Sequence, residues 1–325
     1  MKALVTSKSF AKHSPEALTA LAEAGIELTW ISCPSPTPAQ IAAEIGDSDC
    51  LIVGNDTVDA QVLDAAPKLR LIHMNGTGLD AIDIAAASSR GVFVANAPGA
   101  NRNAVAELTV ALLLVAGRDI VRHTELLASG KWARTAGREL SGKTVGLVGL
   151  GNIGRRVVEL LAGFEPRLVA YDPLPDRSWA AHRRVELARS ADEVFAAADF
   201  LVLTAPLTPQ TENLADARRL ALMKRSAYLV NTARGGLVDE AALCDAVRSG
   251  KIAGAALDAF REEPLPIDSP LRMPGITLTP HLAATSVESA ANVSMAVARN
   301  VIAILVEGRT ELAVNGATVA RLDRE

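Results

Sequence analysis

The chain has 325 residues, of which 49% are hydrophobic and 22% charged, and its formal net charge is −4. This length predicts two domains, and the composition excludes a disordered chain and a basic surface for nucleic acid or anionic membranes. No apolar run approaches the ~18 residues of a membrane span, and the N-terminus lacks the apolar core of a signal peptide, so we expect a cytoplasmic protein. The cysteines Cys33, Cys50 and Cys244 are scattered, which favours structural thiols over disulfides or metal ligands.

Short apolar runs alternate with helical patterns through the first part of the chain, which predicts an α/β domain with a parallel sheet. We expect the first helix to begin with Ser14 as its N-cap and Pro15 in the first turn. Strands are expected at residues 2–6, 26–31, 50–53, 71–74 and 92–95. Together they predict one doubly wound unit.

The stretch from Asn103 to Ser129 is rich in alanine, leucine and valine and is followed by Gly130. It predicts one long helix. Because the stretch is too apolar for a solvent-exposed linker, we expect it to pack against a large surface such as a second subunit.

A dinucleotide motif follows. An apolar run at residues 145–150 leads into a G-x-G-x-x-G loop, and a segment compatible with a helix comes next. In such loops the first glycine makes a tight turn, the second admits a pyrophosphate, and the third lets the helix pack on the strand. The N–H groups at the start of this helix favour an anion. These residues are Gly149, Gly151 and Gly154, with Asn152 and Ile153 opening the helix.

A second apolar strand, at residues 168–171, ends in Asp172. An acidic residue about 20 positions after the glycines binds the ribose 2′-hydroxyl, and its charge would repel a 2′-phosphate. The predicted cofactor is therefore NAD rather than NADP. Further strands are expected at 200–204, 227–231, 254–257 and 276–279, before a long helix at 287–307.

A dinucleotide fold normally begins at its glycine-loop strand, yet a complete α/β pattern precedes that strand here. We therefore expect an inserted NAD-binding domain at residues 99–284, with residues 1–98 and 285–325 forming a substrate domain. The predicted fold class is α/β, with two doubly wound parallel-sheet (Rossmann-like) domains. Two chain crossings predict a hinge and an active site in the cleft between the domains.

Three motifs lie at or just beyond the ends of predicted strands. NTARGGLVDEAAL contains Arg234, ALDAFREEP contains Asp258 and Glu263, and TPHLAATS contains His281. Alone, the arginine is more often a surface charge, the acid a solvated loop residue and the histidine a structural residue. Their common position beside a predicted nicotinamide site indicates chemistry instead.

Reduction of a 2-oxo acid gives each of these residues a role. The planar guanidinium of Arg234 suits a carboxylate and can polarise the carbonyl group. His281 can give a proton to the oxygen and take it back, and the carboxylate of Glu263 favours the protonated imidazole. The cofactor carries the hydride, while the protein orients the reactants.

The chain resembles the D-isomer-specific 2-hydroxyacid dehydrogenases, the family of phosphoglycerate dehydrogenase and the glyoxylate/hydroxypyruvate reductases, over essentially its whole length. Besides the motifs above, it shares NGTGLDAID, NAPGANRNAVAEL and GKW. The resemblance implies Arg234, Glu263 and His281 as catalytic residues and a homodimer formed through the region of residues 103–129. It also places Thr77 and Gly78 at the substrate, with Thr77 touching the cofactor. Around the nicotinamide it places Thr232, Ala233, Arg234, Asp258, His281, Ala283 and Ala284.

The chain also departs from phosphoglycerate dehydrogenases. Where those enzymes hold a phosphate with arginines, this chain has Gly54 and Met74, so we expect an unphosphorylated 2-oxo acid. A chain ending at Glu325 would also lack their regulatory extension. Formate dehydrogenase has glutamine at the position of Glu263, which argues against that activity. The main alternative is an NAD(H)-sensing, corepressor-like module with little turnover, and the sequence does not identify the 2-hydroxy acid.

Overall fold

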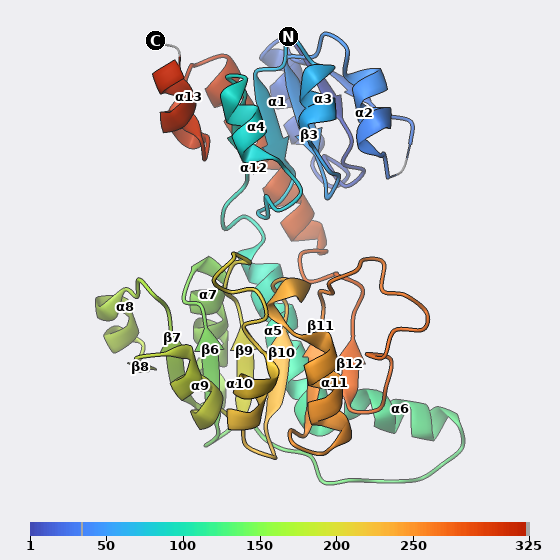
Figure 1. The fold of residues 1–325 in the computed structure, drawn as a ribbon, viewed down its shortest axis with the longest axis vertical. Coiled ribbons are helices and arrows are strands. Elements are labelled where there is room, and N and C mark those ends of the chain that lie inside the picture. The colour runs from blue at the N-terminus through green and yellow to red at the C-terminus, as the bar shows by residue number, and fades with distance from the viewer. Residues whose placement is uncertain (34, 323–325) are drawn as a thin grey trace. The chain divides into compact units, whose positions relative to one another are not determined.

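The computed structural model describes residues 1–33 and 35–322, which fold into two compact units. Unit 1 is formed by Met1–Asn101 together with the chain from Thr285 onward, and unit 2 by Arg102–Ala284. Each unit has its own parallel sheet, covered by helices on both faces (Figure 1).

The sheet of unit 1 has the strand order β2-β1-β3-β4-β5, and all its strands are parallel. The apolar runs of β3 and β4 are buried along their whole length, as expected for strands covered on both faces. Helices α1 and α12 pack on one face, and α2, α3 and α4 on the other. The strands are β1 (Lys2–Val5), β2 (Glu27–Trp30), β3 (Cys50–Val53), β4 (Leu71–Met74) and β5 (Phe93–Ala95). The helices are α1 (Pro15–Glu23), α2 (Pro38–Ile45), α3 (Ala60–Asp64), α4 (Ile84–Ser89), α12 (Val287–Leu305) and α13 (Gly316–Leu322).

The sheet of unit 2 has the order β12-β11-β10-β9-β6-β7-β8 and is parallel throughout. Helices α9, α10 and α11 cover one face, while α5, α7 and α8 cover the other. The strands are β6 (Thr144–Val148), β7 (Arg167–Tyr171), β8 (Val185–Leu187), β9 (Phe200–Leu203), β10 (Tyr228–Asn231), β11 (Gly254–Leu257) and β12 (Ile276–Leu278). The helices are α5 (Arg102–Arg118), α6 (Ile120–Ala128), α7 (Asn152–Leu161), α8 (Arg177–His182), α9 (Ala191–Ala197), α10 (Ala217–Leu222) and α11 (Glu240–Arg248).

The predicted doubly wound parallel-sheet fold is confirmed in both units. One strand was not predicted from the sequence, the edge strand β8, in which only Val185 is buried. A short strand with one buried side chain leaves too weak an apolar pattern to be recognised. Helix α1 begins at Pro15 as expected, but the hydroxyl of Ser14 does not cap it and instead donates to Glu16 at 3.3 Å.

The prediction of one long helix from Asn103 to Ser129 is wrong. Asp119 has φ +50°, in the left-handed region, and this residue divides the stretch into α5 and α6. Helix α5 packs on α7 and β10 and buries its apolar side chains within unit 2. The apolar composition of α5 is therefore explained by the core of its own unit and requires no second subunit. Every residue of α6, in contrast, is at least partly exposed.

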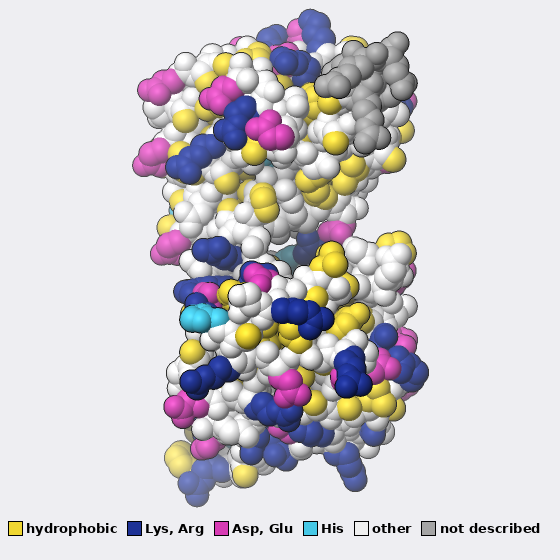
Figure 2. Space-filling view, turned by 90° about the vertical axis from the view of Figure 1, so that its left-hand side faces the viewer, with side chains coloured by type: hydrophobic (Ala, Val, Ile, Leu, Met, Phe, Trp, Pro, Cys, Tyr) yellow, Lys and Arg dark blue, Asp and Glu magenta, His cyan; other side chains and the backbone are white. Residues whose placement is uncertain are grey.

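Charged side chains of both signs lie interspersed on the face shown in Figure 2, without one continuous basic tract. Within residues 1–33 and 35–322, none of the helices is long and apolar enough to cross a membrane.

Candidate active site

The candidate site residues of unit 2 follow its strands at the carboxyl edge of the sheet. The strand order reverses between β6 and β9, and ligands of open α/β sheets bind beyond the carboxyl ends of the strands at such a point. The glycine loop follows β6, and Asp172 follows β7. Arg234, Asp258 and His281 follow the neighbouring strands β10, β11 and β12. The fold thus brings these residues to one edge of one sheet.

Each glycine of the loop after β6 has its own steric reason. Gly149 has φ +106°, and a Cβ atom there would lie 2.7 Å from a main-chain nitrogen beyond β9. A Cβ atom on Gly154 would lie 2.3 Å from the carbonyl oxygen of Gly149, so only glycine lets α7 start this close to β6. At Gly151 a Cβ atom would meet nothing within 4 Å, and among the described residues no side chain caps α7. This open helix N-terminus fits a pyrophosphate at the N–H groups of Asn152 and Ile153.

Asp172 connects the end of β7 with the glycine loop. Its Oδ2 accepts the N–H of Leu150 at 2.8 Å, and its Oδ1 accepts the N–H of Leu174 at 2.9 Å. A carboxylate has about four acceptor positions, so each oxygen retains one for a further donor. The side chain is partly exposed, and this arrangement fits a ribose hydroxyl.

The imidazole of His281 and the carboxylate of Glu263 form a hydrogen-bonded pair. Nδ1 of His281 lies 2.6 Å from Oε2 of Glu263, and Oε1 accepts the N–H of Phe260 at 2.9 Å. Because the carboxylate accepts at Nδ1, that nitrogen carries a proton and Nε2 is left for another partner. No described residue forms a hydrogen bond with Nε2. The side chains of His281 and Glu263 are 36% and 32% exposed, so the pair reaches the surface.

The carboxylate of Asp258 holds the segment that carries His281. Asp258 is 1% exposed, and its Oδ1 accepts the hydroxyl of Thr279 at 2.5 Å and the N–H of Leu282 at 2.9 Å. Its Oδ2 accepts the N–H of Ala283 at 2.9 Å. His281 lies between these contacts and has φ +49°. Residues other than glycine keep this left-handed main-chain conformation only with support from their surroundings. Asp258 supplies that support.

Asn231 holds the turn that carries Arg234. Asn231 is fully buried at the end of β10; its Oδ1 accepts the N–H of Ala233 at 3.1 Å, and its Nδ2 donates to the carbonyl of Arg234 at 2.9 Å. Nη1 of Arg234 donates to the carbonyl of Ala233 at 2.9 Å. A Cβ atom on the next residue, Gly235, would lie 1.9 Å from the carbonyl carbon of Phe260. The Arg234 turn therefore packs main chain to main chain against the segment that carries Glu263.

A buried hydroxyl pair connects α5 with this turn. Oγ1 of Thr109 lies 2.7 Å from Oγ1 of Thr232 and 2.7 Å from the carbonyl of Val105. Because Thr109 gives its single proton to the carbonyl, Thr232 donates to Thr109. Thr109, Asn231 and Gly235 are not among the site residues predicted from the sequence. The NTARGG motif contains the last two, but only the folded contacts show what they do.

The loop after β4 carries Thr77 and Gly78 at the carboxyl edge of the unit 1 sheet. The N–H of Asn75 donates to the carbonyl of Val53 at 2.7 Å, and Nδ2 of Asn96 donates to the carbonyl of Thr77 at 2.7 Å. These bonds fix the loop. In the part of the chain that the structure describes, the N–H groups of Thr77 and Gly78 have no protein acceptor.

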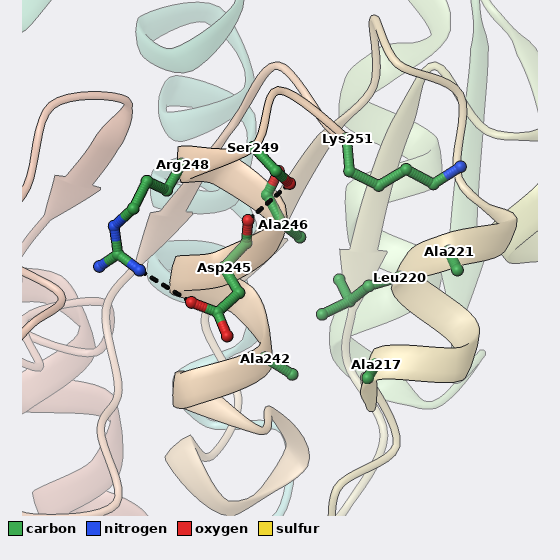
Figure 3. Close-up of a pocket in the computed structure, with 9 residues that line it drawn as sticks. All are labelled: Ala217, Leu220, Ala221, Ala242, Asp245, Ala246, Arg248, Ser249 and Lys251. Atoms are coloured by element: carbon green, nitrogen blue, oxygen red, sulfur yellow. Dashed lines mark hydrogen bonds and ion pairs between the residues drawn. The ribbon is translucent and has the colours of Figure 1, made fainter.

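A groove lies between α10 and α11 (Figure 3). Its lining combines four alanines and Leu220 with four polar or charged residues, of which Asp245 and Arg248 form an ion pair at 2.8 Å. None of the predicted site residues lines this groove, so we assign no chemistry to it.

Residues 110–283 match the family model described as the NAD-binding domain of D-isomer-specific 2-hydroxyacid dehydrogenases. The D-3-phosphoglycerate dehydrogenase of Mycobacterium leprae is 44% identical over 268 residues, which are 81% of this chain and 50% of the relative. The chain therefore spans about half the length of that relative. The glyoxylate reductase of Thermofilum pendens is 39% identical over 280 residues, which are 83% of this chain and 82% of the relative.

A solved structure has a similar fold. The crystal structure of the TT0316 protein from Thermus thermophilus has a TM-score of 0.86 and 35% identity to this chain. The similarity covers 95% of this chain and 97% of that structure. The structural similarity therefore extends over both units and is not confined to the glycine-loop unit.

Proposed function

This chain belongs to the family of D-isomer-specific 2-hydroxyacid dehydrogenases, and from that premise we propose that it interconverts a D-2-hydroxy acid and its 2-oxo acid. The matched NAD-binding domain identifies NAD as the cofactor. The observation that carries the proposal is the 2.6 Å pair of His281 and Glu263 at the sheet edge that also holds the glycine loop. A proton-transfer group and a dinucleotide loop at one edge are what this reaction needs.

His281 is the proposed acid and base. Bound NADH supplies the hydride to C2 of the 2-oxo acid. In this direction the protonated imidazole gives the Nε2 proton to the carbonyl oxygen, and in the reverse direction the neutral Nε2 accepts the hydroxyl proton. Glu263 holds the ring through the proton on Nδ1 and leaves Nε2 for the substrate. Glu263 itself is held by the N–H of Phe260, so the ring has a fixed orientation.

Arg234 is the proposed clamp for the substrate. Its guanidinium offers two parallel N–H donors, which bind a carboxylate in a fixed plane and polarise the adjacent carbonyl group. The N–H groups of Thr77 and Gly78 are assigned to the substrate, and Thr77 also to the cofactor. This assignment is supported by the loop after β4, which is held in place by hydrogen bonds. Among the residues described, neither N–H group of this pair has a protein acceptor.

The proposed cofactor site follows the carboxyl edge of the unit 2 sheet. Open space at Gly151 and the uncapped N-terminus of α7 fit the pyrophosphate. The remaining acceptor positions of Asp172 fit the ribose hydroxyls, and its charge favours NAD over NADP. The assigned residues are Gly149, Gly151, Asn152, Ile153 and Gly154 for the pyrophosphate, Asp172 for the ribose, and Thr232, Ala233, Asp258, Ala283 and Ala284 around the nicotinamide.

We assign an unphosphorylated substrate. The positions at which the resemblance places phosphate-binding arginines carry Met74 and Gly54. A Cβ atom on Gly54 would lie 3.6 Å from Oδ2 of Asp56, whose carboxylate accepts the hydroxyl of Thr6 at 2.5 Å. The negative charge of Asp56 beside Gly54, with no arginine at position 54 or 74, disfavours a phosphate at this edge of the unit 1 sheet.

A second copy of the chain is the proposed partner, and it binds through α6. Ile120, Val121 and Leu127 on this helix are 45%, 43% and 60% exposed, and Trp132 just beyond it is 82% exposed. Figure 1 shows α6 and the segment after it projecting from the body of unit 2. Burial of such apolar side chains in a homodimer is favourable. Light scattering on the protein and on Leu127→Glu tests this, because a monomeric parent protein contradicts it.

The proposed location is the cytoplasm, because Cys33, Cys50 and Cys244 are all free thiols. Reducing compartments keep thiols in this state. Recovery of the native protein from an oxidising compartment alone would contradict this assignment.

The function is tested by mixing the protein with NADH and a panel of 2-oxo acids and following the nicotinamide absorbance. The panel holds glyoxylate, hydroxypyruvate, pyruvate, and branched and aromatic 2-oxo acids. We expect at least one to be consumed, with NADH preferred over NADPH. Tight binding of NADH without consumption of any acid contradicts the proposal and favours an NAD(H)-sensing module.

A further inference from the structure

Asn231 lies where the central strand β10 leads into the turn that carries Arg234. It is the last residue of β10, and β10 lies between β9 and β11. In the register of the sheet it pairs with Leu203 on one side and Leu257 on the other, and its carbonyl accepts the N–H of Asp258 at 2.9 Å. The main chain of Asn231 is therefore fixed from both sides.

The side chain of Asn231 transfers this fixed position to the turn. Its acceptor oxygen binds the N–H of Ala233 at 3.1 Å, and its donor nitrogen binds the carbonyl of Arg234 at 2.9 Å. One short side chain thus satisfies a main-chain donor and a main-chain acceptor in consecutive residues. Both ends of the amide are used by the turn.

Few side chains can replace this amide. Aspartate has the same shape but no donor for the Arg234 carbonyl, and glutamine is longer by one methylene group. Leucine offers neither group and would leave a partly buried N–H and a partly buried carbonyl without these partners, which is costly. The requirement for asparagine therefore comes from the turn and not from any ligand.

We propose that Asn231 is a positioning residue that sets the Arg234 turn so that the guanidinium meets the substrate carboxylate. The inference rests on the proposed role of Arg234 as the carboxylate clamp. Asn231 itself touches neither substrate nor cofactor. With NADH at saturation, its effect on turnover passes through Arg234.

This route makes a kinetic prediction. In Asn231→Ala the turn loses both contacts, and a misplaced clamp reduces kcat/KM for the 2-oxo acid by about 10- to 100-fold. The dissociation constant for NADH should rise by a smaller factor than kcat/KM falls, because the glycine loop and Asp172 are untouched and only Thr232 and Ala233 of the proposed cofactor site lie on this turn. A general loss of structure would weaken both.

A double-mutant cycle with Arg234→Ala isolates the route. We measure kcat/KM for Asn231→Ala and for Arg234→Ala, and then for the double variant. If Asn231 acts through Arg234, adding Asn231→Ala to Arg234→Ala causes no further loss. A second loss of about 10-fold in the double variant would overturn the proposal.

Asn315→Ala is the matched control for stability. Asn315 is also a buried asparagine: its Oδ1 accepts the N–H of Val94 at 2.8 Å, and its Nδ2 donates to the carbonyl of Val92 at 2.9 Å. It lies in unit 1 and has no part in the proposed site. We expect Asn315→Ala to lower the thermal midpoint about as much as Asn231→Ala does, with kcat/KM unchanged.

Hydrogen exchange separates failure of this inference from failure of the proposed function. In a peptide spanning residues 232–237, followed by mass spectrometry, Asn231→Ala should exchange faster and Asn315→Ala should not. Unchanged exchange in Asn231→Ala would overturn the inference whatever the activity. The parent protein could instead be inactive while Asn231→Ala still loosens its turn. That result would contradict the role of Arg234 in turnover, but it would still show that Asn231 holds the turn.

Discussion

The main-chain N–H of Asp258 donates to the main-chain carbonyl of Asn231 at 2.9 Å, across the neighbouring strands β11 and β10. Asn231 holds the turn that carries Arg234, and Asp258 holds the segment that carries His281. The two residues that hold these segments, Asn231 and Asp258, are therefore hydrogen-bonded directly to each other. A disturbance of either strand end reaches both proposed catalytic residues.

The segments that carry Arg234 and Glu263 are also in contact through the main chain of Phe260. Glu263 binds His281 and also accepts the N–H of Phe260, and Phe260 lies against Gly235, next to Arg234. A continuous series of contacts within unit 2 thus links Arg234, Glu263 and His281. The set is held as one body, so small changes in its supports should affect turnover.

Asp258→Asn tests the support of His281. The amide replaces one acceptor oxygen with a donor that faces main-chain N–H groups, so we expect a loss of about 1–3 kcal/mol in the free energy of unfolding. kcat should fall by about 10-fold or more as His281 leaves its position. Urea denaturation and steady-state kinetics measure the two effects. Asp216→Asn, at the N-cap of α10, is the control and should change neither. An Asp258→Asn protein with parental stability and kcat would refute the role of Asp258.

Gly235→Ala tests the contact between the Arg234 turn and the Glu263 segment. A Cβ atom there would lie 1.9 Å and 2.2 Å from main-chain atoms of Phe260, so the two segments must separate. We expect a loss of about 1–3 kcal/mol in stability and of about 10-fold or more in kcat/KM. Gly163→Ala, where a Cβ atom meets nothing within 4 Å, serves as the matched control and should be neutral or slightly stabilising. Equal behaviour of the two variants would show that the close contact does not hold the site.

Much of this arrangement could be predicted from the sequence. Apolar runs located the central strands because such strands are buried on both faces. The glycine spacing located the loop after β6, and the residue types after later strands located Arg234, Glu263 and His281. Residues that follow parallel strands share one edge, so their grouping in unit 2 follows from topology alone.

The remaining features depend on tertiary contacts that leave no local pattern. The edge strand β8 buries only Val185, and the helix break falls at Asp119, which is neither glycine nor proline. Asn231 and Gly235 matter because of main-chain groups that lie elsewhere in the fold. Thr109 meets Thr232 across 123 positions of sequence. None of these partners can be read from residue spacing.

Asp172→Asn tests the choice of cofactor. Asparagine keeps an acceptor for the N–H of Leu150 but removes the negative charge that would repel a 2′-phosphate. We expect the ratio of kcat/KM for NADH to that for NADPH to fall by about 10-fold or more, mainly through a lower KM for NADPH. An unchanged ratio would show that Asp172 does not set the preference.

His73 makes the stability of the protein depend on pH. The ring is fully buried; Nδ1 lies 2.9 Å from the carbonyl of Met74, and Nε2 lies 3.2 Å from Nδ2 of Asn300. Burial lowers the pKa of His73 from 6.5 to about 4, although the bond to Met74 acts in the opposite direction. The folded protein therefore holds this ring neutral, whereas the unfolded chain takes up a proton as the pH falls below about 6.5.

The stabilising contribution of a neutral His73 is complete above its unfolded pKa and is lost as the pH falls toward the folded value. Between pH 7 and pH 5 we expect His73 to cost about 2 kcal/mol of the unfolding free energy. Urea denaturation of the parent protein and of His73→Gln at both pH values isolates this part. An equal pH dependence in the two proteins would exclude His73 as its source.

The central claim is that His281 gives a proton to the substrate oxygen while hydride reaches C2. It is tested most directly by a single turnover with NADH that carries deuterium on its transferable position, using the 2-oxo acid found in the panel. We predict deuterium at C2 of the D-2-hydroxy acid, and for His281→Ala a rate at least about 100-fold lower with NADH affinity retained. Product without deuterium at C2, or a His281→Ala protein as fast as the parent, would contradict the account.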